Sequence, residues 1–200
     1  MRFISNRSTG VMGYKIAARA LARGHRVTLI SGPVKITPPR VQRLILIETS
    51  EDLLRALKKE IKKTDCLIMC AAVGDFKARK ISGKKIKRKN NLLVNLKANK
   101  DILRELARHK KHNLFVGFNL ETENLVRNAE KKLKTKNLDI MVANRLTKYH
   151  NPFGDNNLDV VIIDRFGKNA NLKAKDKGFI ANVLLDKIEE LWYLKRKGKL

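Results

Sequence analysis

The chain has 200 residues, 43% of them hydrophobic and 6% aromatic, so it is long enough to bury a core without disulfides or bound metal. No apolar run approaches the ~20 residues that a membrane-spanning helix needs, and MRFISNRS at the start lacks an apolar signal core. We therefore expect a cytoplasmic protein with no membrane partner. The 45 Lys and Arg against 19 Asp and Glu give a net charge of +26, which attracts polyanions. The basic residues are spread along the chain without an aromatic platform, so a nucleic-acid partner is not favoured.

Helical and strand-like segments alternate along most of the chain. The first half is expected to contain a helix over 14–23, strands over 26–32 and 41–49, a helix from Thr49 to about Lys63, and a strand over 66–73; Thr49 and Asp52 have the spacing of a capping box at the start of the second helix. The second half is expected to contain a helix over 100–110, a strand over 113–118, a helix over 122–136, strands over 138–145 and 158–164, and a closing helix over 176–195. A turn is expected at Gly167, after the last of these strands. This alternation predicts one α/β domain over 1–200, built on a doubly wound, Rossmann-like parallel sheet.

The run CLIMCAAV, residues 66–73, is apolar throughout. Such a run is typical of a central parallel strand covered on both faces. Cys66 and Cys70 lie four residues apart in it, about 13 Å along an extended strand, which is too far for a disulfide. We expect both thiols to be inert packing groups.

A basic insert interrupts the alternation. KARKISGKKIKRKNN, residues 77–91, has eight basic residues and no acidic ones, and LLVNL after it reads as a strand. We interpret 77–97 as a basic β flap or arm that projects from the sheet. A solvated, disordered loop fits the pattern equally well.

Small polar residues and glycines precede the first predicted helix. Unpaired N–H groups at a helix start suit a phosphate, Ser8 and Thr9 can donate hydroxyls, and Gly10 and Gly13 allow close backbone approach. The spacing is neither a Walker loop nor a full dinucleotide fingerprint. The two glycines are also explained by tight packing of the helix on a strand.

Two further segments end predicted strands, where ligands bind in open parallel sheets. In AAVGDF, residues 71–76, the small side chains leave room for a flat ring, and Asp75 can accept ribose hydroxyls or hold hydrated magnesium. In VGFNLET, residues 116–122, Phe118 can stack on a base or belong to the core. A loop aspartate that caps a turn is the plainer reading of Asp75.

Several stretches together resemble the phosphopantothenate–cysteine ligase (phosphopantothenoylcysteine synthetase) family, in the bacterial CTP-dependent form. They are ISNRSTGVMGYKIA, VTLISGPV, CAAVGDF, GKKIKRK, NKDIL, VGFNLETEN, KKLKTKNLDIMVANR and FGDNN, in the family's order from residue 3 to about 160. The resemblance implies joining of 4′-phosphopantothenate to L-cysteine through an acyl-cytidylate, giving 4′-phosphopantothenoylcysteine in coenzyme A biosynthesis. It also implies CTP as co-substrate (ATP in the eukaryotic branch), Mg²⁺, and a homodimer formed through the insert.

The resemblance also assigns site residues. It implies catalytic roles for Asn6, on the carboxylate and the acyl-cytidylate, and for Lys85, in the later step. The nucleotide would be bound by Ala71, Asp75, Lys85, Asn99, Lys100, Asp101, Ile102, Phe118, Lys132 and Lys136, to which the helix-start argument adds Ser8 and Gly10. Lys132 and Lys136 lie one helical turn apart, so both are expected on one helix face. No metal ligand and no role for Asn144 is assigned.

Two features depart from the family. Members begin with a strand and a glycine-containing loop before the I-S-N motif, where only MRF stands here, and the flavin-dependent decarboxylase domain is absent from this sequence. An inactive remnant of the ligase is therefore one alternative function. A basic nucleic-acid-binding protein is another, and a nicotinamide-dependent reductase is a third, although no Tyr-x-x-x-Lys pair is present: Tyr14 and Lys15 are adjacent.

Overall fold

A computed structural model of the chain describes residues 4–88, 90–146 and 154–198. The helices are α1 (Val11–Ala22), α2 (Ser50–Glu60) with a 3₁₀ turn after it (Ile61–Lys63), α3 (Ile102–Ala107), α4 (Leu125–Thr135) and α5 (Lys177–Arg196). The strands are β1 (Thr28–Ser31), β2 (Arg43–Leu46), β3 (Cys66–Met69), β4 (Phe76–Ala78), β5 (Leu96–Ala98), β6 (Leu114–Glu121), β7 (Ile140–Arg145), β8 (Leu158–Asp164) and β9 (Asn169–Lys175).

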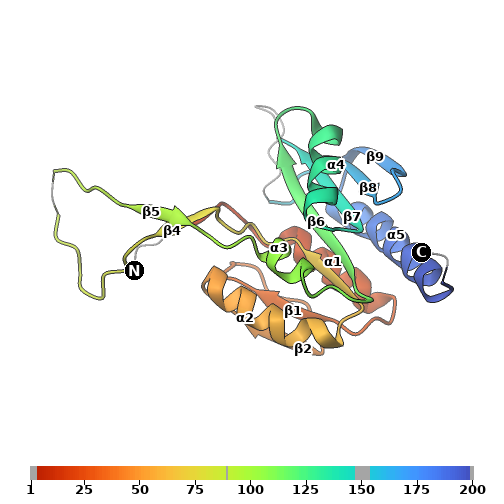
Figure 1. Cartoon of the computed structure of the whole chain (residues 1–200), viewed down its shortest axis with the longest axis horizontal. Coiled ribbons are helices and arrows are strands. Elements are labelled where there is room, and N and C mark those ends of the chain that lie inside the picture. Colours follow the sequence, from red (N-terminus) through yellow and green to blue (C-terminus); the bar gives the residue numbers. More distant parts are fainter. Residues whose placement is uncertain (1–3, 89, 147–153, 199–200) are drawn as a thin grey trace.

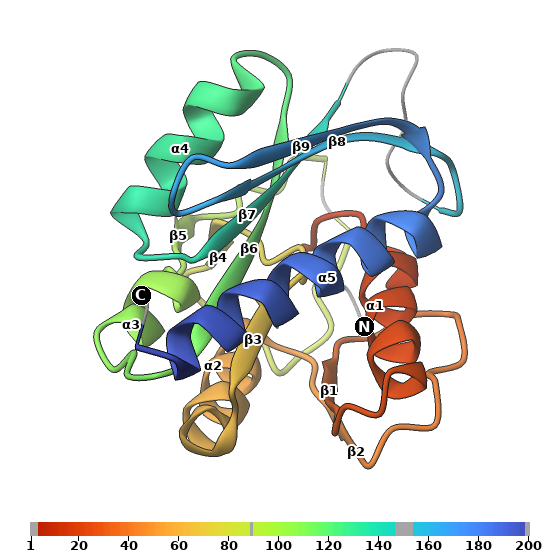
Figure 2. The ribbon, with the colours of Figure 1, turned by 90° about the vertical axis from the view of Figure 1, so that its right-hand side faces the viewer.

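The main sheet has five strands in the order β3-β6-β7-β8-β9. Strands β3, β6 and β7 run parallel, whereas β8 and β9 form an antiparallel hairpin at the far edge. The hairpin turns at Gly167, whose φ of 83° is readily adopted only by glycine. Helices cover both faces of the sheet (Figures 1 and 2). The doubly wound α/β class predicted from the sequence is confirmed, with an antiparallel addition at one edge.

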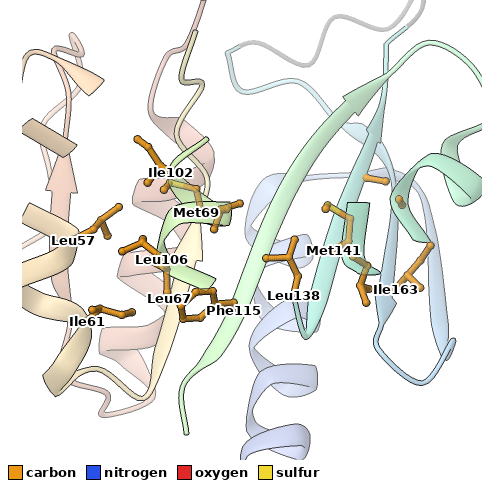
Figure 3. Packing of buried hydrophobic residues seen from close by; sticks show 14 of the residues in the cluster. Leu57, Ile61, Leu67, Met69, Ile102, Leu106, Phe115, Leu138, Met141 and Ile163 are labelled. Carbon is orange, nitrogen blue, oxygen red and sulfur yellow. The ribbon is translucent and has the colours of Figure 1, made fainter. Parts of the chain in front are cut away.

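Two buried clusters lie on opposite faces of this sheet. On one face, α2, α3 and α4 pack against the odd-numbered residues of β6 and β7, including Phe115 and Met141 (Figure 3). On the other face, α1 and α5 pack against the even-numbered residues, including Val116 and Val142. This alternation follows from the two-residue period of a strand and fixes the direction in which each side chain of β6 and β7 points.

A separate parallel pair, β1 and β2, lies beside the main sheet. The prediction of a central strand over 66–73 is wrong in two respects, its length and its position in the sheet. β3 covers only Cys66–Met69, and in the described part of the chain it pairs with β6 alone, at an edge. The apolar run correctly indicated two covered faces, but hydrophobicity does not report backbone pairing.

Helices α2 and α3 begin at capping side chains, and several elements are shorter than the sequence predicted. The capping box is confirmed: the Asp52 N–H donates to Thr49 Oγ1 (3.1 Å) and the Thr49 N–H donates to Asp52 Oδ2 (3.1 Å). The predicted strands over 26–32 and 41–49 shorten to four residues each. The helix expected over 100–110 also shortens, because Asp101 caps it and it ends at Ala107.

The insert forms a narrow antiparallel ribbon of β4 and β5, three residues on each side. Figure 1 shows the ribbon and the loop beyond it extending away from the body of the molecule. Of the strand predicted over 92–96, only Leu96 belongs to β5. A salt bridge between Lys77 and Glu51 joins the base of the arm to α2. No helix within the described ranges is long and apolar enough to cross a bilayer.

Candidate functional site

The start of α1 lies at the carboxyl end of β1. Gly10 is the N-cap residue with φ 77°, and no side chain caps the helix, so its first N–H groups have no side-chain acceptor. A Cβ at Gly10 would lie 3.0 Å from Val34 Cγ1, and the Tyr14 and Ser31 hydroxyls lie 2.9 Å apart. Glycine is thus required here by backbone conformation and by packing, and the helix start remains open to an anion. Ser8 is exposed beside it.

Asn6 lies next to the loop that follows β3. Its Nδ2 donates to the carbonyl oxygen of Val73 at 3.3 Å, and the side chain is otherwise exposed. Asp75 and Ala71 of the same loop are also exposed. The N-terminal segment and the β3 loop thus present an amide and a carboxylate near one another at the carboxyl edge of the sheet.

Asn99 holds the other side of this loop. Its backbone N–H donates to the Asp75 carbonyl oxygen (2.7 Å), and its Nδ2 donates to the Gly74 carbonyl oxygen (2.8 Å). The Ser50 hydroxyl donates to Asn99 Oδ1 (3.1 Å) and ties the assembly to α2. Ser50 was not singled out from the sequence, and a hydroxyl 49 positions from its partner gives no sequence signal.

The start of α3 is joined to the end of α4. Asp101 Oδ1 accepts from the Arg104 N–H (3.1 Å), and its Oδ2 lies 2.9 Å from Lys136 Nζ. Burial alone would raise the pKa of Asp101, but the Lys136 hydrogen bond, the Arg104 N–H and the nearby positive charges together lower it. Lys136 therefore has a carboxylate partner in this structure.

Lys132 is also paired. Its Nζ donates to Asn119 Oδ1 (2.6 Å) and to Glu121 Oε1 (2.8 Å), and Asn128 Nδ2 donates to Glu121 Oε2 (3.0 Å). The Lys132 hydrogen bond is the main cause of the lowered pKa of Glu121. Both predicted lysines are thus held on the α4 face of the sheet, by separate carboxylates.

Not every predicted residue can meet a ligand in the expected way. The Ile102 side chain is buried in the α2–α4 cluster, so only its backbone N–H at the start of α3 is available. Phe118 is half-buried and packs against the α1–α5 cluster. Lys100 is exposed in the turn before α3.

Lys85 lies apart from the other predicted residues. It is exposed on the arm, and no hydrogen bond or ion pair joins it to the body within the part of the chain that the structure describes. Among the described residues, no hydrogen bond or ion pair links Lys85 to Asn6, the other predicted catalytic residue.

The described hollows lie beside α4, and the described residues contain no metal cluster. An open hollow of about 660 Å³ lies beside the α4 N-terminus, between Arg127, Arg145 and Lys173, and contains none of the predicted residues. Among residues 4–88, 90–146 and 154–198, no group of three or more His, Cys, Asp and Glu could hold a metal ion. Burial raises the pKa of Cys66 and of Cys70 to about 12, which fits the expected inert thiols.

A parallel-rich sheet with amides and carboxylates in the loops at its carboxyl edge, and with paired lysines on α4 and at its end, defines a Rossmann-like α/β domain. The model of the DNA/pantothenate metabolism flavoprotein C-terminal domain matches residues 1–191, and the chain belongs to this family. The predicted family relationship is thereby confirmed.

Named relatives and a solved structure agree with this assignment. The coenzyme A biosynthesis bifunctional protein CoaBC of Bacillus subtilis is 35% identical over 193 residues, covering 96% of this chain and 48% of that protein. A protein of an unknown prokaryotic organism, named cysteine/cysteine sulfinic acid decarboxylase, is 39% identical over 191 residues, 94% of this chain and 53% of its own. The chain therefore spans about half the length of these relatives. The crystal structure of the C-terminal domain of a CoaBC protein superposes with a TM-score of 0.81 at 30% identity, covering 96% of this chain and 87% of that one.

Proposed function

We propose that the chain is a phosphopantothenate–cysteine ligase that joins 4′-phosphopantothenate to L-cysteine with CTP and Mg²⁺. The observation that carries the proposal is the carboxyl edge of the sheet, where Asn6, Asp75 and Asn99 are linked through one loop. Membership in the pantothenate-metabolism family and the CoaBC relatives support the same reaction. A cytoplasmic location goes with this proposal.

The reaction needs positive charge close to a polyanion. In the first step, the carboxylate of 4′-phosphopantothenate attacks the α-phosphorus of CTP, and pyrophosphate leaves as the acyl-cytidylate forms. Lysines and a magnesium ion held by the phosphates would reduce the repulsion between the two anions. Magnesium is commonly bound by one or two carboxylates together with substrate phosphates, and exposed Asp75 fits the role of such a carboxylate.

Asn6 suits the carboxylate that reacts. Its amide is neutral, so it can donate a hydrogen bond without holding the nucleophile in an ion pair. The open start of α1 at Gly10, with Ser8 beside it, offers N–H and hydroxyl donors to a phosphate. In the second step the amine of cysteine attacks the acyl carbon, CMP leaves, and the amine loses a proton.

Lys132 and Lys136 would contribute by exchanging partners. Each ammonium is now bound to a carboxylate, Glu121 or Asp101, at the protein surface. A bound triphosphate would compete for these ammonium groups, since charge-assisted hydrogen bonds contribute roughly 1.5–3 kcal/mol. The nearby backbone of 99–102 would contact the nucleotide from the other side.

The arm would complete the site in a homodimer. Lys85 lies on an extended arm whose apolar side chains Ile81, Leu92 and Leu93 are 90%, 56% and 87% exposed. Burial of these side chains against a second copy would stabilise a dimer, because each buried apolar side chain contributes about 1.5–3 kcal/mol. Lys85 would then approach the acyl phosphate and shield it from water.

The test is an assay with the purified chain, 4′-phosphopantothenate, cysteine, magnesium and CTP or ATP in separate reactions. We expect pyrophosphate and 4′-phosphopantothenoylcysteine in equal amounts, with CTP preferred. Omission of cysteine should leave pyrophosphate release limited to about one equivalent of enzyme. CO₂ release from cysteine without pyrophosphate, or no product with either nucleotide, would contradict the proposal.

A further inference from the structure

The open hollow of about 660 Å³ beside α4 belongs to the face of the sheet that α4 covers. Along β7 and β8 the odd-numbered residues point to this face, as Ala143 and Val161 of the α2–α4 cluster do. Arg145 at the end of β7 and Asp159 near the start of β8 continue this alternation, and both line the hollow. Figures 1 and 2 show the β8–β9 hairpin beside α4. The hollow therefore lies between the first turn of α4 and the edge of the sheet where β7 ends.

A β-bulge in the hairpin lies at the same place. The register of β8 and β9 shifts between Leu158 and Val160, so that β9 has one residue more than β8 there. Ala174 in the bulge has a φ of 49°, in the left-handed region that residues other than glycine rarely adopt, and its N–H donates to Asp159 Oδ1 at 2.8 Å. Bulges commonly redirect a neighbouring side chain, and Lys173, directly before Ala174, lines the hollow. The hairpin thus contributes a cation to the hollow.

Three cations from different elements line the hollow: Arg127 of α4, Arg145 of β7 and Lys173 of β9. Their side chains are exposed, and within the described part of the chain none of the three charged groups has an ion-pair or hydrogen-bond partner. The predicted nucleotide-binding lysines of α4 are, by contrast, each paired with a carboxylate. Asp159 is the one acidic side chain among the described lining residues, and its Oδ1 already accepts from the Ala174 N–H. Three cations against one carboxylate leave an excess of two positive charges.

The remaining lining combines the start of α4 with apolar side chains. Asn124 does not cap the helix with its side chain, and the first turn contains no acidic residue, so the N–H groups and the helix dipole add to the attraction for an anion. Leu125, Val160 and Val161 are buried, and Val126 is 43% exposed. The hollow therefore has apolar walls and basic groups at its opening, and its volume lies within the range of about 300–1,000 Å³ that is usual for small-molecule sites.

We propose that this hollow binds a small organic phosphate ester, at a site separate from the predicted nucleotide-binding residues, none of which lines it. A phosphate monoester carries about −1.5 to −2 charges at pH 7, which matches the excess positive charge of the lining better than a carboxylate does. Arg127 and Arg145 would bind the phosphate oxygens, because a planar guanidinium can donate two parallel hydrogen bonds to a phosphate. The organic part would lie against Val126 and Val161. This inference holds whether or not the chain is a ligase.

The test titrates the isotope-labelled full chain with phenyl phosphate at pH 7 and constant ionic strength, and follows the backbone amides by NMR. The amide signals of 124–127 and 171–173 should shift and saturate together, while those of 50–60 in α2 stay in place. The shifts should persist in the presence of CTP with magnesium. Benzoate has the same ring and a single negative charge, and it should bind at least about threefold more weakly.

Two double variants separate specific binding from the general attraction of a basic chain. Arg127→Gln with Arg145→Gln should weaken phenyl phosphate binding by about tenfold or more, because both charge-assisted hydrogen bonds are lost. The matched control is Arg26→Gln with Arg40→Gln, which removes two exposed arginines that precede β1 and β2 and should change the affinity by less than about twofold. All four side chains are exposed, so both double variants should keep the melting temperature. Lys173→Gln, on a different element, should weaken binding by about threefold.

Four results would overturn the proposal. They are the absence of saturating shifts at 124–127, equal affinities of the two double variants, equal affinity for benzoate, and displacement of phenyl phosphate by CTP with magnesium. The last result would place the phosphate at the substrate edge instead of in the hollow. Saturating shifts at 124–127 in a chain without ligase activity would support the proposal, because the site does not depend on that reaction.

Discussion

Lys136 Nζ lies 2.9 Å from Oδ2 of Asp101, so an ion pair joins the last turn of α4 to the first turn of α3. The two residues are 35 positions apart in sequence, and the contact brings two predicted nucleotide-binding residues together. It also means that Asp101 has two functions in the free protein, because it caps α3 as well as pairing with Lys136. Substitutions can separate these functions.

Asp101→Asn should destabilise the chain slightly, by about 0–1 kcal/mol at pH 7, because asparagine keeps the cap and removes only the ion pair. Asp101→Ala should cost about 1 kcal/mol more. The folded-state pKa of Asp101 is lowered, so its stabilising effect is present above the unfolded-state pKa and is lost as the pH falls through the folded-state pKa. Urea denaturation at pH 7 and at about pH 3 should show a smaller deficit for the Asn variant at the lower pH. A deficit of equal size at both pH values would contradict the ion-pair account.

Glu121→Gln should strengthen binding of CTP with magnesium by roughly three- to tenfold, because the triphosphate no longer has to displace a carboxylate from the Lys132 ammonium group. Lys132→Gln should weaken it. Isothermal titration calorimetry gives both affinities, and Glu130→Gln on the exposed side of α4 is the matched control. Weaker binding by the Glu121 variant would indicate that Glu121 orients Lys132 instead of competing for it.

Lys85→Gln should slow product formation and CMP release roughly 10²-fold while leaving the melting temperature unchanged, because the side chain is exposed on the arm. Lys84→Gln, next to it and equally exposed, is the control. CTP with magnesium should also protect residues 77–97 from proteolysis if the arm closes on the site. Parallel loss of melting temperature and activity would argue against a catalytic role, as would unaltered cleavage.

Two glycines should respond in opposite ways to alanine. A Cβ at Gly117 would lie 2.6 Å from Leu138 Cδ1 in the core, so Gly117→Ala should destabilise by about 1–3 kcal/mol. Gly13 lies inside α1 with open space around its Cα, so Gly13→Ala should stabilise by about 0.5–1 kcal/mol. If backbone near Gly13 approaches a phosphate, the same change should raise the KM for CTP. Thermal unfolding and steady-state kinetics check the two effects separately, and an unchanged KM would show that the backbone near Gly13 does not approach the phosphate.

Asp139 is a fully buried carboxylate directly before β7. It accepts from the Phe115 N–H (2.7 Å) and pairs with Lys110 (2.5 Å) and Arg165 (3.0 Å). Asp139→Asn should destabilise by about 3–5 kcal/mol, because it leaves Lys110 without its counter-ion in a buried position. Asp186→Asn, which removes an exposed partner of Arg23, should change stability by about 0–1 kcal/mol. Similar urea midpoints for both variants would contradict this difference.

The alternation of apolar segments was sufficient to predict the fold class, because a two-residue period and a helical period bury different faces and leave different patterns. The capping box at Thr49 and Asp52 likewise predicted a helix start correctly, since both hydrogen bonds form within four residues. Family membership followed from the order of short motifs. These are properties that neighbouring residues determine together.

Tertiary structure alone decided the partners of the charged groups and the pairing of the strand edges. Nothing in the sequence near Lys132 or Lys136 indicates Glu121 or Asp101 as its counter-ion, because strand order brings those carboxylates to α4. The apolar run at 66–73 indicated burial but not that β3 pairs with β6 alone among the described strands, because a strand's hydrogen bonds come from backbone groups that every residue carries. Side-chain pattern therefore determined which faces are covered, and the packing of distant segments decided which groups meet at the carboxyl edge of the sheet.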